Sequence, residues 1–141
     1  MTPPEALPGA VQRYCIRVPS EKSIATTAVE VQFPDSIEVT QLESPGGWQA
    51  TAQKDRRSRI ASALWQGGSI PPRQFLEFGV VARNPAAEMD LAWKAIQTYA
   101  DGSEVHWIGP PRAQFPAAIT SVRASATQKA DACSSGPAPL H

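Results

Sequence analysis

The sequence is poor in histidine and cysteine, the residues that most often bind transition metals or act as nucleophiles. Its 141 residues include two histidines, His106 and His141, and two cysteines, Cys15 and Cys133. No Cys-x-x-Cys or His-x-x-x-His pair occurs, which excludes the usual structural and helix-borne zinc sites. No serine lies in a Gly-x-Ser-x-Gly elbow, so we expect no nucleophilic catalysis and predict that the chain is not an enzyme. Two cysteines do not define a disulfide framework, and we expect no disulfide between them.

Net charge and long apolar runs are also absent. Thirteen basic and thirteen acidic residues cancel, so no long-range field attracts nucleic acid, and we expect no nucleic-acid partner. The one basic cluster, Lys54, Arg56, Arg57 and Arg59, is interrupted by Asp55 and is typical of a solvated hairpin loop. No stretch approaches the roughly 18 apolar residues that span a bilayer, and no signal peptide is visible, so we expect no membrane insertion by this segment.

Proline and short alternating runs are abundant instead. The 14 prolines fall between the apolar runs rather than inside them, as in chains built from strands and turns. Hydrophobic residues make up 42% of the chain, which is enough for one compact domain. We predict eight or nine short strands, at 11–18, 27–33, 37–42, 48–52, 60–65, 75–82, 88–99, 104–108 and 118–122.

The clearest local signal is a hairpin over residues 91–108. Asp101-Gly102 joins two extended runs, and this pair tolerates the positive φ values of a tight hairpin turn. Gly67-Gly68 is expected to end a strand. The pattern as a whole predicts an all-β fold, an immunoglobulin-like or cupredoxin-like β-sandwich, over residues 1–122.

Residues 123–141 differ from the rest of the chain. They have no periodic apolar face and cannot bury enough surface to offset their ordering entropy. We therefore predict a disordered C-terminal tail.

The four tryptophans divide into two groups. We expect Trp48, Trp65 and Trp93 to be core residues, because large aromatics dominate burial in sandwiches. Trp107 lies near a strand end, where its ring can face either a core or a ligand. His106 should point to the opposite face of the sheet from Trp107 and be exposed.

Several motifs occur in an order that resembles one bacterial family. They are Arg17-Val18-Pro19-Ser20-Glu21-Lys22, Pro45-Gly46-Gly47-Trp48, Gly67-Gly68-Ser69-Ile70-Pro71-Pro72 and Trp93-Lys94-Ala95-Ile96-Gln97-Thr98-Tyr99. Over about residues 2 to 122, the chain resembles the YcnI-like family of bacterial copper-binding domains. The resemblance implies a periplasmic or secreted β-sandwich that binds copper(II) in copper homeostasis, as a chaperone or metal-delivery domain. The partners it implies are the copper ion and copper-transporting membrane proteins.

The resemblance also implies a metal site. In this family the mature chain begins with a histidine whose α-amine and imidazole hold the metal, while a glutamate and a tryptophan complete the surroundings. The matching residues here are Glu5 and Trp107. The first histidine of this chain is His106, so the expected amino-terminal ligand is missing, and we attribute this to truncation before Met1. Copper(II) favours nitrogen and oxygen donors, whereas an indole shields a cation better than it bonds one.

Three classes of function stay open at this point. The first is a copper-binding domain without catalysis, the second a metal-free β-sandwich that docks a protein partner, and the third a copper oxidase. The oxidase ranks last because the chelating histidine is absent from these residues. Two alternatives also remain: Glu5 as a solvated terminal charge, and His106 as a substitute metal ligand rather than a merely exposed histidine.

Overall fold

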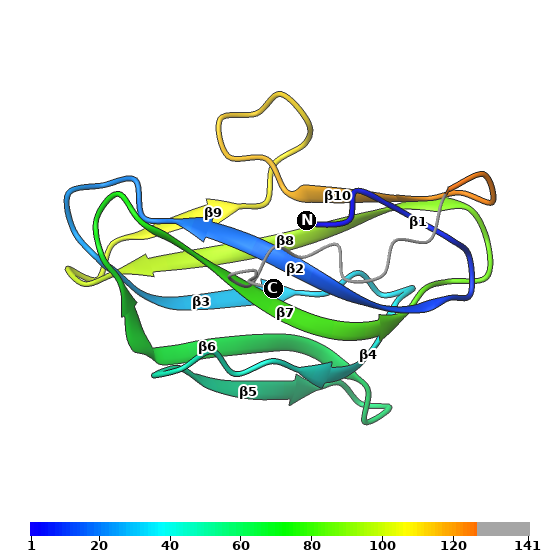
Figure 1. Cartoon of the computed structure of the whole chain (residues 1–141), viewed down its shortest axis with the longest axis horizontal. Coiled ribbons are helices and arrows are strands. Elements are labelled where there is room, and N and C mark those ends of the chain that lie inside the picture. Colours follow the sequence, from blue (N-terminus) through cyan, green and yellow to red (C-terminus); the bar gives the residue numbers. More distant parts are fainter. Residues whose placement is uncertain (127–141) are drawn as a thin grey trace, which may run out of the picture.

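The computed structural model describes residues 1–126, and these form ten strands connected by turns (Figure 1). The strands are β1 (Glu5–Ala6), β2 (Val11–Pro19), β3 (Thr26–Gln32), β4 (Glu38–Leu42), β5 (Gln49–Lys54), β6 (Ile60–Ile70), β7 (Phe75–Arg83), β8 (Met89–Tyr99), β9 (Glu104–Trp107) and β10 (Ala118–Val122). Within this range no helix is long and apolar enough to cross a membrane.

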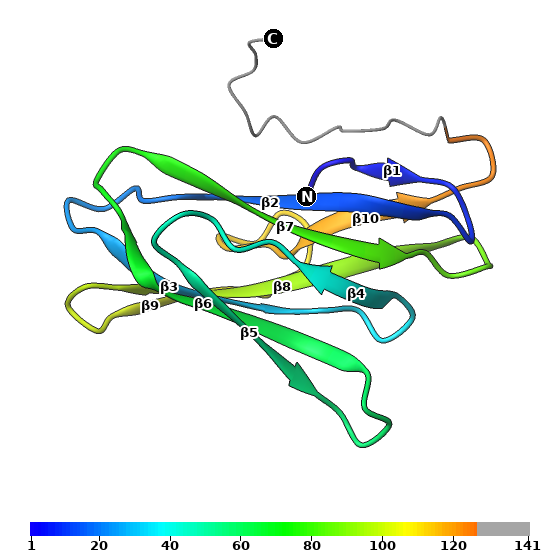
Figure 2. The same cartoon turned by 60° about the horizontal axis from the view of Figure 1, so that its bottom comes forward.

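The strands form a strongly curled sheet in the order β1-β10-β8-β3-β6-β4-β7-β2, with β5 added to β6 and β9 added to β8. The two ends of this order meet. The Thr2 N–H donates to the Cys15 carbonyl and the Cys15 N–H donates to the Thr2 carbonyl, both at 2.9 Å. Figure 2 shows β2 and β7 lying over β3, β6 and β8. The chain is therefore a sandwich whose layers enclose the core.

Alternation along the strands directs one face of each layer inward. Trp65 and Trp93 are 0% exposed and Trp48 is 6% exposed, which confirms the prediction that these three residues belong to the core. Their ring contacts cross between strands: Trp48 and Trp65 each lie 5.2 Å from Phe78, and Trp93 lies 5.0 Å from Tyr14 of the opposite layer. Burial of these large rings supplies much of the apolar area that holds the layers together.

Each buried indole N–H has a partner, as burial requires. Trp65 donates to the Glu43 carbonyl at 2.7 Å, and Trp93 donates to the Thr120 hydroxyl at 3.0 Å. The Trp93–Thr120 bond joins β8 to β10.

The predicted strands are all present, and the structure differs from the prediction in one additional strand and one longer strand. β1 was not predicted, because two residues between prolines show no alternation. The predicted break at Gly67-Gly68 is wrong, because β6 continues through both glycines to Ile70. Gly68 is needed there for space, since the Trp48 ring lies where a side chain would begin.

The hairpin predicted over residues 91–108 is confirmed. β8 and β9 pair from Ala95 opposite Trp107 to Thr98 opposite Glu104. At the turn, Gly102 has a φ of 86°, and its N–H donates to the Tyr99 carbonyl at 2.9 Å.

Two further predictions concern the cysteines and the C-terminal tail. Cys15 is disulfide-bonded, which corrects the expectation of no disulfide, an expectation drawn from the small number of cysteines alone. Cys133 and His141 lie outside the described residues. Of the predicted tail, only residues 123–126 are described, so its disorder stays a prediction.

The close approach at Gly68 gives a test of the core. A Cβ at Gly68 would lie 2.4 Å from the Trp48 indole, whereas a Cβ at Gly46 would meet nothing within 4 Å. We expect Gly68→Ala to lower the free energy of unfolding by about 1–3 kcal/mol, the usual cost of overpacking. Gly46→Ala is the matched control and should stay within about 0.5 kcal/mol of the wild type. Denaturant unfolding measures both, and equal effects at the two positions would contradict the packing described here.

Candidate functional site

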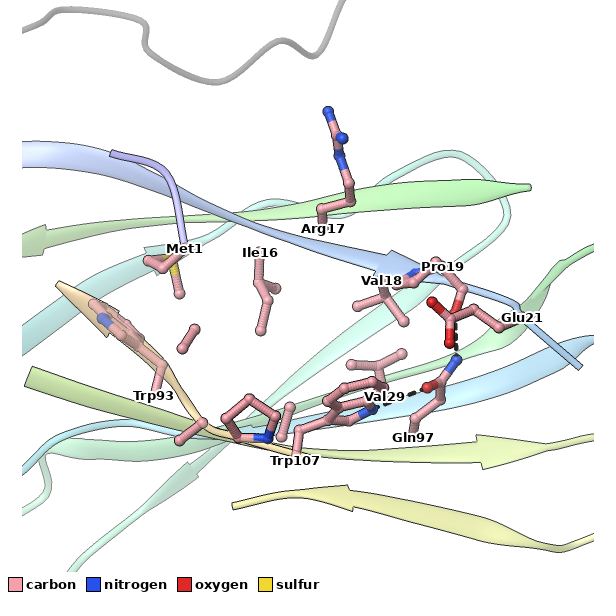
Figure 3. Close-up of a pocket in the computed structure, with 14 residues that line it drawn as sticks. Met1, Ile16, Arg17, Val18, Pro19, Glu21, Val29, Trp93, Gln97 and Trp107 are labelled. Carbon is pink, nitrogen blue, oxygen red and sulfur yellow. Dashed lines mark hydrogen bonds between the residues drawn. The ribbon is translucent and has the colours of Figure 1, made fainter. Parts of the chain in front are cut away.

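A cavity of about 420 Å³ lies between the layers beside Trp107 (Figure 3). Its walls come from β2, β3, β8 and β9 and from the start of β10. Apart from the indoles of Trp93 and Trp107, the polar side chains that line it belong to Arg17, Glu21 and Gln97. The rest of the lining is apolar, and the two charged residues, Arg17 and Glu21, are both exposed at its edge.

Trp107 forms one wall of this cavity. Pairing of β9 with β8 places Trp107 opposite Ala95, and its indole N–H donates to the Gln97 side-chain oxygen at 3.1 Å. Phe115 packs edge-on against the ring, with centroids 5.2 Å apart. The indole is therefore held both by its contact with the Phe115 ring and by the hydrogen bond of its N–H.

Glu21 lies on a turn that follows β2 directly, and the turn is fixed by its neighbours. The Ser20 N–H donates to the Gln74 carbonyl and the Arg73 N–H donates to the Ser20 carbonyl, both at 2.8 Å. The Ser20 hydroxyl donates to the Ile24 carbonyl at 3.0 Å and closes the turn. Figure 3 shows Glu21 grouped with Gln97 at one end of the cavity, and Trp107 beside them.

Tyr99 holds the same turn from the opposite side. Its hydroxyl is hydrogen-bonded to the backbone of Glu21 and Lys22. The Lys22 ammonium lies 4.6 Å from the centre of the Tyr99 ring and 3.3 Å from the Ser103 hydroxyl. Burial raises the pKa of Tyr99, the negative charge of Glu21 raises it further, and the two backbone hydrogen bonds oppose both. The Glu21 carboxylate is thus close enough for Tyr99 to sense its charge.

The structure brings together Trp107 and Glu21 rather than Trp107 and Glu5. Glu5 is exposed on β1, opposite Ser121 of β10, and it is not among the residues that line the cavity. Its neighbour Ala6 is buried, so strand alternation places the Glu5 side chain on the outer face. Sequence reasoning did not single out Glu21 as a cavity residue, although Glu21 is part of the motif that carried the resemblance.

His106 is exposed, as predicted, and lies outside the cavity lining. Its imidazole Nε2 lies 2.9 Å from the Glu104 carboxylate, a neighbour two positions away on the same strand face. The site therefore has no imidazole from the described part of the chain.

The donors in the cavity make an incomplete metal site. Glu21 offers one carboxylate, while the Gln97 amide already uses its oxygen and its nitrogen in hydrogen bonds. Among residues 1–126 no group of three or more His, Cys, Asp or Glu side chains could hold a metal ion. Further ligands would have to come from outside this set.

Fold and cavity together define a β-sandwich domain with a cavity between its layers. A crystal structure of a Nocardia farcinica protein with an immunoglobulin-like fold is similar to it, with a TM-score of 0.71 and 32% identity, covering 83% of this chain and 91% of that one. A type II cohesin domain from Acetivibrio cellulolyticus covers 83% of this chain and 89% of its own, with 10% identity and a TM-score of 0.50, which shows the fold alone. The predicted all-β, immunoglobulin-like class is confirmed.

The chain belongs to the family described as "Domain of unknown function (DUF1775)", whose model matches residues 1–127. The copper-binding protein CutI of Bacillus subtilis (strain 168) is 38% identical over 131 residues, which are 92% of this chain and 63% of CutI. The chain thus spans less than two thirds of the length of this relative. The resemblance to the YcnI-like family is confirmed.

The position of the Glu21 charge can be tested through Tyr99. We expect Glu21→Gln to lower the pKa of the Tyr99 phenol, because removal of a nearby negative charge makes deprotonation easier. Tyrosinate absorbance followed through alkaline pH, in a Tyr14→Phe background, measures this one phenol. Glu5→Gln is the matched control and should leave the titration unchanged. An unchanged titration in Glu21→Gln would place the carboxylate away from Tyr99.

Proposed function

We propose that this chain is a copper-binding domain without catalytic activity, and that the cavity beside Trp107 holds copper(II). The observation that carries the proposal is the 38% identity to the copper-binding protein CutI over 92% of the chain. The cavity supports the location, because it combines the Glu21 carboxylate with an indole wall in a largely apolar lining.

The two side chains have different tasks in this proposal. Glu21 supplies an oxygen donor, which copper(II) accepts readily alongside nitrogen. The indole face of Trp107 stabilises the cation electrostatically and limits access of water. Glu5, the carboxylate that the resemblance selects, remains the alternative ligand, and the experiment below separates the two.

Nitrogen donors complete the site in this proposal, and we place them ahead of Met1. Met1 lines the cavity, so a histidine carried by preceding residues would be delivered to the same place. An imidazole and an amine together with one carboxylate would give the mixed nitrogen and oxygen donor set that copper(II) prefers.

The wider role rests on the family resemblance. We propose that the domain is extracytoplasmic, takes part in copper homeostasis, and passes copper to or from a copper-transporting membrane protein. A chaperone needs a site that releases its ion, and a site with one carboxylate on the rim of an open cavity suits release.

The second candidate is a metal-free interaction module. It is favoured by two exposed apolar side chains next to the cavity, Ile108 at 46% and Phe115 at 37% exposure. This surface would suit a protein partner whether or not copper binds.

Titration with copper(II) tests the main proposal. The protein should carry its preceding residues with the histidine, and binding is followed by quenching of tryptophan fluorescence. We expect Glu21→Gln to weaken binding about tenfold or more, or roughly 1.4 kcal/mol, because an anionic donor is lost. Trp107→Phe should weaken binding less and remove most of the quenching. Glu5→Gln removes the alternative carboxylate in the same way and should leave binding unchanged if Glu21 is the ligand.

Each pattern of results has a definite meaning. Weaker binding in Glu5→Gln with wild-type binding in Glu21→Gln would assign the ligand role to Glu5. Absence of quenching in the histidine-bearing wild type, with no binding by calorimetry, would overturn the copper proposal and favour the interaction module.

A further inference from the structure

We propose that Gln97 is a positioning residue of the copper cavity: its side-chain amide fixes the Trp107 indole relative to the turn that carries Glu21. This inference rests on the proposed function. In that proposal Gln97 lines the cavity but does not bind the ion.

The Gln97 amide makes three hydrogen bonds, which join Trp107 to the end of β2 and to the start of β3. Its oxygen accepts the Trp107 indole N–H at 3.1 Å, and its nitrogen donates to the Pro19 carbonyl at 2.7 Å and to the Thr26 hydroxyl at 2.8 Å. The partners fix the orientation of the amide, because an indole N–H can only donate and a carbonyl can only accept. Gln97 is 1% exposed, so these bonds do not compete with water.

The network continues past Pro19 into the turn. The Thr26 hydroxyl donates to the Ser20 hydroxyl at 3.1 Å, and Ser20 in turn donates to the Ile24 carbonyl at 3.0 Å. Hydrogen bonds therefore run without interruption from the Trp107 indole to the backbone on both sides of Glu21.

The choice of residue at this position is informative. The other inward side chains of β8 are Leu91, Trp93, Ala95 and Tyr99, which are largely apolar and buried. An apolar residue at position 97 would pack in the same space without the cost of burying an amide. The amide therefore calls for an explanation beyond packing, and its position between Trp107 and the Glu21 turn provides one.

The consequence for the cavity is chemical. While Gln97 accepts the indole N–H, that donor is occupied, and the Glu21 carboxylate keeps its lone pairs for a cation. Without this acceptor, the indole N–H would be left to seek another oxygen in the cavity, and Glu21 lines the same cavity. Gln97 thus prevents the Trp107 indole N–H from donating a hydrogen bond to the Glu21 carboxylate.

The test compares Gln97→Met with Thr120→Val. Each substitution removes the acceptor of one buried indole N–H, from Trp107 in the first case and from Trp93 in the second. Before copper is added, proton NMR should show a shift of the Trp107 indole N–H signal only in Gln97→Met, and of the Trp93 signal only in Thr120→Val. Copper(II) affinity of the histidine-bearing chain should fall about tenfold in Gln97→Met, as for other residues that orient metal ligands, and stay unchanged in Thr120→Val.

A second variant separates positioning from a merely structural effect. In Gln97→Glu the introduced carboxyl can donate to the Pro19 carbonyl only when protonated. The Trp107 indole signal should therefore return toward its wild-type position as pH falls, a pH dependence that the wild type and Thr120→Val should lack. This measurement needs no copper, and it also decides the matter if Gln97→Met does not fold.

The outcomes distinguish this inference from the proposed function. If the wild type binds copper and Gln97→Met binds it equally well, or if the Trp107 signal is unmoved in both Gln97 variants, the positioning role is overturned. If the wild type binds no copper, the proposed function fails, whatever the indole signals show.

Discussion

Packing of the Trp93 ring between the two layers is the contact on which the cavity depends. The ring lies 5.0 Å from Tyr14 of β2 and 5.9 Å from Phe33 at the end of β3. Its N–H is bonded to Thr120 of β10, while one face of the ring also lines the cavity. Trp93 therefore sets the spacing of the layers and closes one end of the space between them. The opposite end is closed by a hydrogen-bonded cluster around Gln97.

These two ends follow different physical rules. At the Trp93 end, the layers are held by apolar contact, which is not directional and tolerates small displacements. At the Gln97 end, each group must meet a specific partner, because an unpaired polar group there would be buried without water. A site that must present one carboxylate and one ring face in a fixed relation belongs at the second end, and Glu21 and Trp107 are both found there.

The sequence was sufficient to predict the strands, the sandwich and the three core tryptophans, because each depends on alternation within a short segment. It failed at Gly68, since the reason for glycine there is the ring of Trp48, twenty positions away in the chain and adjacent only in the fold. The candidate carboxylate Glu21 was not singled out for a similar reason, and Glu5 stays a prediction. Motif matching finds a carboxylate near a chain end, but the pairing of β1 with β10 and the bonds of Ser20 and Tyr99 decide which one reaches the cavity.

Gln97 was within reach of sequence reasoning. It occupies an inward position of β8 by alternation, and the hairpin register places it near Trp107, opposite Val105. A polar residue at an inward position of an otherwise apolar strand is a signal that needs no knowledge of the fold. Its partners across the layers, Pro19 and Thr26, could be found only from the structure.

The charges around the cavity favour a cation at Glu21. Two cations lie close to this carboxylate in sequence or in space, and both are directed to other partners. The Arg17 guanidinium lies 4.5 Å from the centre of the Phe75 ring and 3.9 Å from the Glu77 carboxylate, and Figure 3 shows it pointing out of the cavity. The Lys22 ammonium lies over the Tyr99 ring. Because both positive charges are held away, the field inside an apolar lining is set by one carboxylate and by the negative face of an indole. Both attract a positive ion at the open edge of the cavity.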